Sequence, residues 1–233
     1  MLTAIGFDAD DTLWQNERFF ALTQAHFAEL LADHTEKEHL MARLLEAERR
    51  NLPHYGFGIK GFTLSMIETA IEVTEGRVPA RVIEEILTAG RDMLSHEIEL
   101  LPHVEEVLDA LEGRFKLILI TKGDLLDQER KLAQSGLRAR FDVIEIVSAK
   151  SAVAYRDIFA RHAQGADAGL MVGNSMASDV LPMIEAGGWG VFCPQELSWE
   201  VEHAEPPVGQ DRFAEIADLG ALPALVERIV ARG

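Results

Sequence analysis

The sequence lacks the features that would place it in a membrane or in an oxidising compartment. It has one cysteine, Cys193, so no internal disulfide can form, in agreement with a reducing environment. No apolar run approaches the about 18 residues that span a bilayer. The N-terminal residues have no basic flank of the kind that begins a signal peptide. We therefore expect a cytoplasmic protein that does not bind a membrane.

Basic residues are also scarce. There are 22 Lys and Arg against 39 Asp and Glu, which gives a formal net charge of −17 at pH 7. Because nucleic-acid backbones bind to clustered Lys and Arg, we expect no nucleic-acid partner. The same charge repels anionic small molecules, so an anionic substrate would need a local group of cations, backbone amides or a metal ion.

Several familiar catalytic motifs are missing. The chain has no Gly-x-Ser-x-Gly elbow and no phosphate-binding loop of the Gly-x-x-x-x-Gly-Lys type. None of the eight histidines has the spacing of a metal-ligand pair. Serine-hydrolase chemistry, nucleoside-triphosphate binding and a histidine metal centre are therefore not indicated.

The order of apolar segments predicts a parallel sheet covered by helices. A short apolar strand ends at Asp8, and residues 16–98 then show only the period of amphipathic helices. From residue 101 onward, helices alternate with short strands, a pattern typical of a doubly wound, Rossmann-like α/β fold. We expect an α/β core of residues 1–15 and 97–233, with an α-helical domain inserted at 16–96.

The individual elements can be placed along the second part of the chain. Strands are expected at residues 116–121, 141–147, 170–173 and 189–193, with an edge strand near 213–216. Helices are expected at residues 103–111, 125–135, 152–162 and 177–186, with a last one from Pro223.

Polar residues follow several of these strands. Asp8 and Asp10 follow the first strand, and Asn174 and Asp179 follow the strand at 170–173. The strand at 116–121 ends at Thr121, with Lys122 and Gly123 next, and Lys150 lies just past the strand at 141–147. Ligands of doubly wound folds bind at the carboxyl ends of the strands, so we expect these residues to form one site.

This set matches the requirements of phosphoryl transfer. Such a reaction needs a nucleophile, a proton donor for the leaving oxygen, and groups that neutralise the phosphoryl oxygens. Asp8 is the candidate nucleophile and metal ligand, and Asp10 the candidate acid and base. Thr121, the backbone amides near Lys122 and Gly123, and Lys150 are the candidate phosphate-binding groups.

The motifs resemble those of the haloacid dehalogenase superfamily. The resemblance spans residues 5–187 and includes Asp8-x-Asp10-x-Thr12, Thr121, Lys150, and Gly173-Asn174-Ser175 followed by Asp179. It implies an aspartyl-phosphate intermediate on Asp8 and a helical cap at 16–96. It also implies Mg²⁺, bound by Asp8, the backbone carbonyl of Asp10, and Asn174 or Asp179. The expected substrate is a small phosphorylated metabolite.

Two positions depart from the superfamily pattern. Asn174 stands where many members have Asp, so the metal site would have one negative charge fewer and Asp179 could compensate. Ser151 follows Lys150 where Pro is frequent, so Lys116, Lys122 and Lys131 remain alternatives for the cation.

The segment from Pro53 to Gly61 is expected to be a loop, because it contains one proline and three glycines. Its glycine spacing matches a dinucleotide-binding pattern, but that motif must follow a buried strand. The loop is therefore interpreted either as a contributor to selection of the leaving group or as a connector between cap helices.

Other functions remain as alternatives. A hydrolytic dehalogenase of small 2-haloacids would use the same nucleophile but would not need the Asp10 carboxylate. A phosphotransferase, a phosphonatase with Lys60 as its Schiff-base lysine, or a binding protein without catalysis would keep the fold. The pattern leaves the individual metabolite undefined and fits a monomer or a homodimer.

Overall fold

The computed structural model describes residues 1–232, which divide into two compact units. The α/β unit consists of residues 1–17, 98–122 and 128–232, and the helical unit consists of residues 18–97 and 123–127. The inserted helices therefore form a compact body of their own, and the five residues that follow the second strand group with that body. Within the described residues, no helix is both long and apolar enough to cross a membrane.

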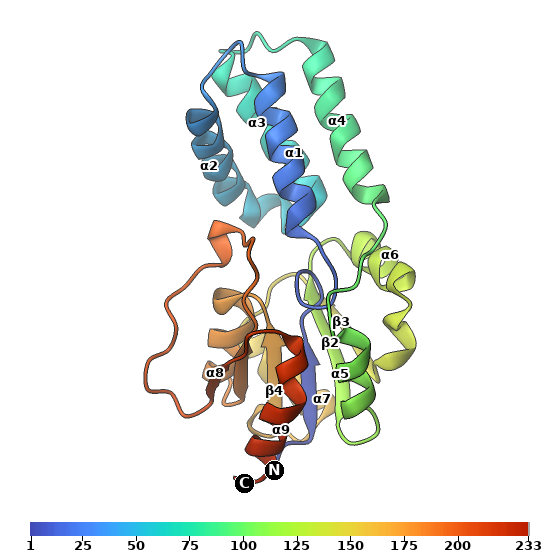
Figure 1. The fold of residues 1–233 in the computed structure, drawn as a ribbon. Helices are drawn as coiled ribbons and strands as arrows, with labels where there is room; N and C mark the ends of the chain where they lie inside the picture. Colours follow the sequence, from blue (N-terminus) through green and yellow to red (C-terminus); the bar gives the residue numbers. More distant parts are fainter. Residues whose placement is uncertain (233) are drawn as a thin grey trace. The chain divides into compact units, whose positions relative to one another are not determined.

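The α/β unit contains one six-stranded sheet (Figure 1). Its strands are β1 (Ala4–Phe7), β2 (Lys116–Lys122), β3 (Val143–Val147), β4 (Gly169–Gly173), β5 (Trp189–Phe192) and β6 (Phe213–Glu215). Every neighbouring pair is parallel, in the order β3-β2-β1-β4-β5-β6. Phe7 aligns with Leu119 on one side and with Val172 on the other, so the carboxyl ends of three strands meet around Asp8.

Alternating side chains of the strands build two apolar cores, one on each face of the sheet. One face packs against α5 (Val104–Leu111), α6 (Leu125–Ser135) and α9 (Leu222–Val230). The other packs against α7 (Ala152–His162) and α8 (Leu181–Glu185). Because parallel strands require crossover connections, the helices cover both faces, which confirms the predicted doubly wound fold.

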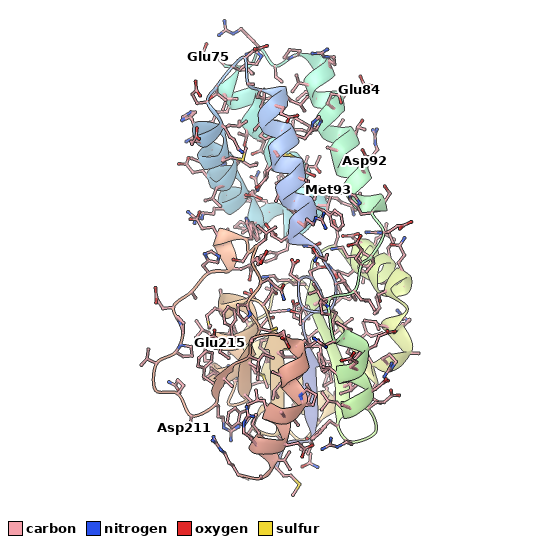
Figure 2. The ribbon with its side chains drawn as sticks, viewed as in Figure 1. Glu75, Glu84, Asp92, Met93, Asp211 and Glu215 are labelled. Atoms are coloured by element: carbon pink, nitrogen blue, oxygen red, sulfur yellow. The ribbon has the colours of Figure 1, made fainter. Side chains whose placement is uncertain are left out.

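The helical unit has four helices around one apolar core. They are α1 (Glu17–Leu30), α2 (Lys37–Tyr55), α3 (Ile59–Val73) and α4 (Ala80–Ser95). Each contributes buried side chains, among them Phe27, Leu44 and Met66. Figure 2 labels Glu84 and Asp92, which are exposed on α4, and Met93, which is buried in the core. This segregation is what the helical period of the sequence predicts.

The expected loop from Pro53 to Gly61 is wrong in extent. Helix α2 continues through Pro53 to Tyr55, and α3 begins at Ile59, so only residues 56–58 are non-helical. Pro53 lies in the last turn of α2, where its missing N–H removes one hydrogen bond without ending the helix. Gly56, with φ of 73°, then ends the helix. Since the glycines join two helices, they do not fit the strand-to-helix turn of a dinucleotide site.

The other predicted elements are close to those observed. The helices at 125–135 and 152–162 are confirmed at both ends, and the strands lie within two residues of their expected limits. The helix expected at 177–186 instead begins with a π-helical turn, Met176–Val180, ahead of α8. In this turn Val180 N donates to Ser175 O, five residues back, and Pro182 has no N–H to restore the α-helical pattern.

Candidate active site

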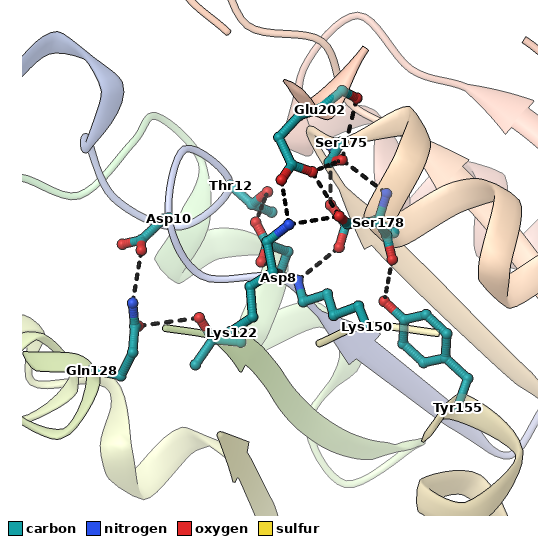
Figure 3. A network of polar contacts seen from close by, with 12 residues as sticks. Asp8, Asp10, Thr12, Lys122, Gln128, Lys150, Tyr155, Ser175, Ser178 and Glu202 are labelled. Carbon is teal, nitrogen blue, oxygen red and sulfur yellow. Dashed lines mark hydrogen bonds and ion pairs between the residues drawn. The ribbon is translucent and has the colours of Figure 1, made fainter. Parts of the chain in front are cut away.

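Asp8 lies at the centre of a buried polar cluster at the carboxyl end of β1 (Figure 3). Its backbone N–H donates to Val172 O at 2.9 Å, which fixes the position of Asp8 beside β4. Thr12 Oγ1 donates to Asp8 Oδ2 at 3.1 Å, and the Lys150 ammonium group donates to Asp8 Oδ1. The side chain is 9% exposed, so the carboxylate is almost completely enclosed by these groups.

Lys150 joins Asp8 to a second buried carboxylate. Lys150 Nζ lies 2.7 Å from Asp179 Oδ1, and the side chains of Lys150 and Asp179 are 1% and 0% exposed. The other Asp179 oxygen accepts a hydrogen bond from Ser175 N at 3.0 Å. Asp179 also packs closely against Gly173, where an added Cβ would be 2.2 Å from Asp179 Oδ2, so only glycine fits at the end of β4.

The electrostatics of this trio favour a positive partner. Burial raises the pKa of Asp8, the Asp179 carboxylate raises it further, and Lys150 only partly offsets both, leaving the pKa of Asp8 at about 7. Burial alone would lower the pKa of Lys150, but the two carboxylates raise it above its ordinary value. The ammonium group is therefore held charged, and the two carboxylates still lack one compensating positive charge.

Asn174 faces two oxygen atoms of the first motif. Its side-chain amide lies 3.1 Å from Asp8 Oδ2 and 3.2 Å from the Asp10 backbone oxygen. With its NH₂ group turned toward them, Asn174 donates to both; with its oxygen turned toward them, three oxygens converge. Adjacent ligand oxygens of an octahedral Mg²⁺ are separated by about 3 Å, given bonds of about 2.1 Å. These residues therefore fit a hard divalent cation.

This set differs from a metal site made only of acidic or histidine side chains. No group of three His, Cys, Asp or Glu side chains within residues 1–232 is arranged to hold a metal. The oxygens beside Asp8 instead come from an amide and a backbone carbonyl. The Asp179 carboxylate accepts hydrogen bonds from Lys150 and from Ser175 N, and thereby holds Lys150 in place.

Asp10 points its carboxylate to a different set of partners. Trp14 Nε1 and Gln128 Nε2 donate to it at 2.7 and 2.8 Å, and Lys131 Nζ lies 2.9 and 3.1 Å from its two oxygens. Burial by itself would raise the pKa of Asp10, but Lys131 and these hydrogen bonds outweigh it and lower the pKa. In this conformation the expected acid and base is an ionised, hydrogen-bonded carboxylate.

The candidates after β2 separate into three environments. Thr121 is buried and donates to Gln128 Oε1 at 3.1 Å, so Gln128 bridges Thr121 and Asp10. Lys122 donates to Ser178 Oγ at 2.6 Å and to Glu202. Gly123, with φ of 137°, belongs to the segment that groups with the helical unit.

The alternative lysines are accounted for by their positions. Lys131 pairs with Asp10, Lys122 pairs with Glu202, and Lys116 is exposed at the opposite end of β2. Lys150 contacts Asp8 directly, as the resemblance implies.

Several residues of the cluster were not expected from the sequence. Gln128 was not singled out, and Lys131 was considered only as an alternative phosphate-binding cation; the two lie three residues apart on α6 and both contact Asp10. Ser178 and Glu202 join through Lys122, and Glu202 comes from the connection after β5, where no sequence pattern marked it.

The order and geometry of these motifs agree with a comparison to known families. A family model described as haloacid dehalogenase-like hydrolase matches residues 2–187. The chain belongs to this hydrolase family. A haloacid dehalogenase-like hydrolase from Xanthomonas campestris is 40% identical, with a TM-score of 0.85, and the match covers 99% of this chain and 93% of that chain. The resemblance seen in the sequence is confirmed.

More distant members of the haloacid dehalogenase-like family share the fold. YfnB of Bacillus subtilis, solved with bound magnesium, is 18% identical with a TM-score of 0.67, covering 97% of this chain and 98% of that chain. The L-2-haloacid dehalogenase of Xanthobacter autotrophicus is 16% identical with a TM-score of 0.66, covering 98% and 99%. No curated protein matches the sequence. The fold therefore does not choose between phosphate and haloacid substrates.

Proposed function

We propose that this hydrolase is a Mg²⁺-dependent phosphatase that acts on a small phosphorylated metabolite through an aspartyl-phosphate intermediate on Asp8. The observation that carries the proposal is the position of Asn174 and the Asp10 carbonyl oxygen beside Asp8 Oδ2. A dehalogenase has no use for a divalent cation there. The charges agree, because the Asp8 and Asp179 carboxylates share the single ammonium group of Lys150.

Asp8, the Asp10 carbonyl and Asn174 would hold the metal. When bound, Mg²⁺ supplies positive charge that neutralises the phosphoryl oxygens and lowers the pKa of Asp8. Lys150 supplies the second positive charge and holds Asp8 Oδ1, while Thr12 holds Asp8 Oδ2. These contacts fix the carboxylate in one orientation before the substrate binds.

The reaction has two displacements at phosphorus. In the first, a carboxylate oxygen of Asp8 forms a bond to phosphorus, the bond to the ester oxygen breaks, and protonated Asp10 gives its proton to the leaving alkoxide. In the second, Asp10 takes a proton from water, the water oxygen bonds to phosphorus, and the bond to Asp8 breaks. Inorganic phosphate leaves and both aspartates return to their initial state.

Asp10 must change partners for this sequence to occur. Its carboxylate is hydrogen-bonded to Trp14, Gln128 and Lys131, and its low pKa keeps it ionised. We assign the helical unit the role of a cap that excludes water during the reaction, and the desolvation that accompanies closure would favour the protonated form of Asp10.

The test is release of inorganic phosphate from para-nitrophenyl phosphate and from a panel of phosphorylated metabolites, with Mg²⁺ and with EDTA. We expect turnover that requires Mg²⁺ and falls by at least about three orders of magnitude in Asp8→Asn. Asp33→Asn, on an exposed aspartate of the helical unit, is the matched control and should keep full activity.

The outcomes separate the alternatives. Full activity in Asp8→Asn would contradict the proposed mechanism. Chloride release from 2-chloropropionate without phosphate release would identify a dehalogenase. Metal binding without turnover of any substrate would identify a binding protein on this fold.

A further inference from the structure

Lys122, Ser175, Ser178 and Glu202 form a compact group within the α/β unit, which we call the Glu202 cluster (Figure 3). The Lys122 ammonium group donates to one carboxylate oxygen of Glu202, and the Ser175 and Ser178 hydroxyls donate to the other. The Ser178 contact is 2.6 Å. Three donors therefore converge on a single carboxylate, an arrangement with the chemistry of an anion-binding site.

The donors of the cluster are rigidly placed. Ser178 N donates to Ser175 Oγ at 2.9 Å, and Tyr155 OH donates to Ser178 O at 2.9 Å, which fixes the π-helical turn that carries Ser178. Lys122 is the last residue of β2, so its backbone is held by the sheet. The side chains of Lys122 and Glu202 are 15% and 14% exposed. Because these donors are preorganised and mostly desolvated, we expect them to keep their positions if the Glu202 carboxylate is removed.

The acceptor of the cluster has a different origin. Glu202 lies in a short 3₁₀ turn, Glu200–Glu202, on the connection between β5 and β6. Residues 194–212 of that connection contain no strand and no α-helix. Burial alone would raise the pKa of Glu202, but Lys122 and the two serine hydroxyls outweigh it and lower the pKa. The cluster therefore binds its occupant as a negatively charged carboxylate.

The cluster adjoins the proposed catalytic residues. Lys122 follows Thr121 directly, Ser175 follows Asn174, and Ser178 precedes Asp179. Burial raises the pKa of the Tyr155 hydroxyl, the carboxylates of Asp179, Asp8 and Glu202 all act on it and raise it further, and Figure 3 shows Glu202 and the two serines beside Asp8. A group bound in place of Glu202 can therefore belong to a molecule that also reaches Asp8. One ammonium group and two hydroxyls match the single charge of a carboxylate, whereas a second phosphate with about two charges would leave its excess charge uncompensated.

We propose that Lys122, Ser175 and Ser178 form an anion subsite that binds the carboxylate of a phosphorylated carboxylic acid, and that Glu202 occupies this subsite as an internal ligand when no substrate is bound. The identity of the substrate class rests on the proposed phosphatase function, whereas the anion subsite does not. Binding of the substrate displaces Glu202 and moves its connection away from Lys122.

The subsite is tested first without any phosphate ester. Glu202→Ala should lower the melting temperature, because it leaves Lys122 and two hydroxyls without their acceptor. Sodium acetate should restore part of this loss in a saturable manner, compared with sodium chloride at equal ionic strength. Acetate should not restore the melting temperature of the double variant Glu202→Ala, Lys122→Met. It should restore that of the control double variant Glu202→Ala, Lys116→Met, because Lys116 is an exposed lysine.

The substrate class is tested with two pairs of esters that differ in a carboxylate. These are phosphoglycolate against ethyl phosphate, and 3-phosphoglycerate against glycerol 3-phosphate. In at least one pair the wild type should favour the carboxylate member in kcat/KM. Glu202→Gln, a neutral side chain of the same size, should raise this preference by about tenfold or more, and Lys122→Met should abolish it.

The two tests fail in different ways. Acetate with no more effect than chloride would overturn the subsite. Acetate rescue with turnover of esters but no carboxylate preference in either pair would overturn the substrate class. Acetate rescue without turnover of any ester would leave the subsite standing and would contradict the phosphatase function.

Discussion

At the scale of single residues, Asn174 gives this site a property that an aspartate would not. Its amide can present either NH₂ or oxygen to Asp8 Oδ2 and the Asp10 carbonyl. The NH₂ group satisfies both oxygens in the absence of a cation, and the oxygen can face a cation when one binds. A carboxylate could perform only the second role, so the metal-free site would contain three mutually repelling oxygens.

We therefore predict that Asn174→Asp has opposite effects on the two states. In EDTA the variant should unfold more easily, by about 2 kcal/mol, because two acceptors lose their donor and a negative charge is added. Its Mg²⁺ affinity should rise, because one more ligand is charged. Thermal unfolding with and without Mg²⁺ and isothermal titration measure both effects. Gln164→Glu, the same change at an exposed position, is the control, and equal stability of Asn174→Asp and wild type in EDTA would contradict the argument.

Lys131 is the residue that sets the resting state of Asp10. The Lys131 side chain is 6% exposed and that of Asp10 is 22% exposed, so removal of the lysine leaves a largely enclosed carboxylate without its cation. We predict that Lys131→Met lowers the free energy of unfolding by about 3 kcal/mol at neutral pH. Urea unfolding measures this loss, and Lys116→Met, at an exposed lysine, should show almost none.

The loss should depend on pH with a defined sign. The pKa of Asp10 in the folded state is below its ordinary value of 3.8, so the ion pair contributes stability above that value. As the pH falls through the folded-state pKa, Asp10 is protonated and the contribution disappears in the wild type. The difference between wild type and Lys131→Met should therefore shrink in acid. A difference that is constant with pH would show that Lys131 stabilises the fold by packing alone.

At the scale of elements, the sequence was informative wherever a pattern repeats. Helices α6 and α7 follow from apolar residues at helical spacing, and the parallel strands follow from short apolar runs between them. The segment from Pro53 to Gly61 is mostly helical, so its content of proline and glycine does not predict its structure. Their position near the end of α2 decides their effect.

The residues of the site also differ in whether a sequence pattern predicts their position. Asp8, Lys150 and Asn174 could be placed together because each follows a strand, and parallel strands bring their carboxyl ends to one edge. The partners of Asp10 depend on side-chain directions of α6, and Glu202 depends on the course of an irregular connection. Neither has a period or a motif, so these contacts are visible only in three dimensions.

At the scale of the whole molecule, the net charge of −17 opposes the binding of an anionic substrate. The lysines of the site do not reverse this field, because each is already paired: Lys122 with Glu202, Lys131 with Asp10, and Lys150 with Asp8 and Asp179. Substrate must therefore approach against repulsion until it reaches the metal. Salt screens charges that lie more than about 10 Å apart at 0.1 M ionic strength, while close, buried pairs are screened much less.

We predict that kcat/KM for a phosphorylated acid rises about threefold between about 10 mM and 150 mM KCl at fixed Mg²⁺, through a lower KM. Choline chloride at the same ionic strength should act alike, because the effect is screening and not binding of potassium. Phosphoethanolamine, whose ammonium group offsets part of its charge, should respond less. A fall of kcat/KM with added salt would mean that the metal and lysines dominate the field at the entrance, so that substrate is attracted before it reaches the site.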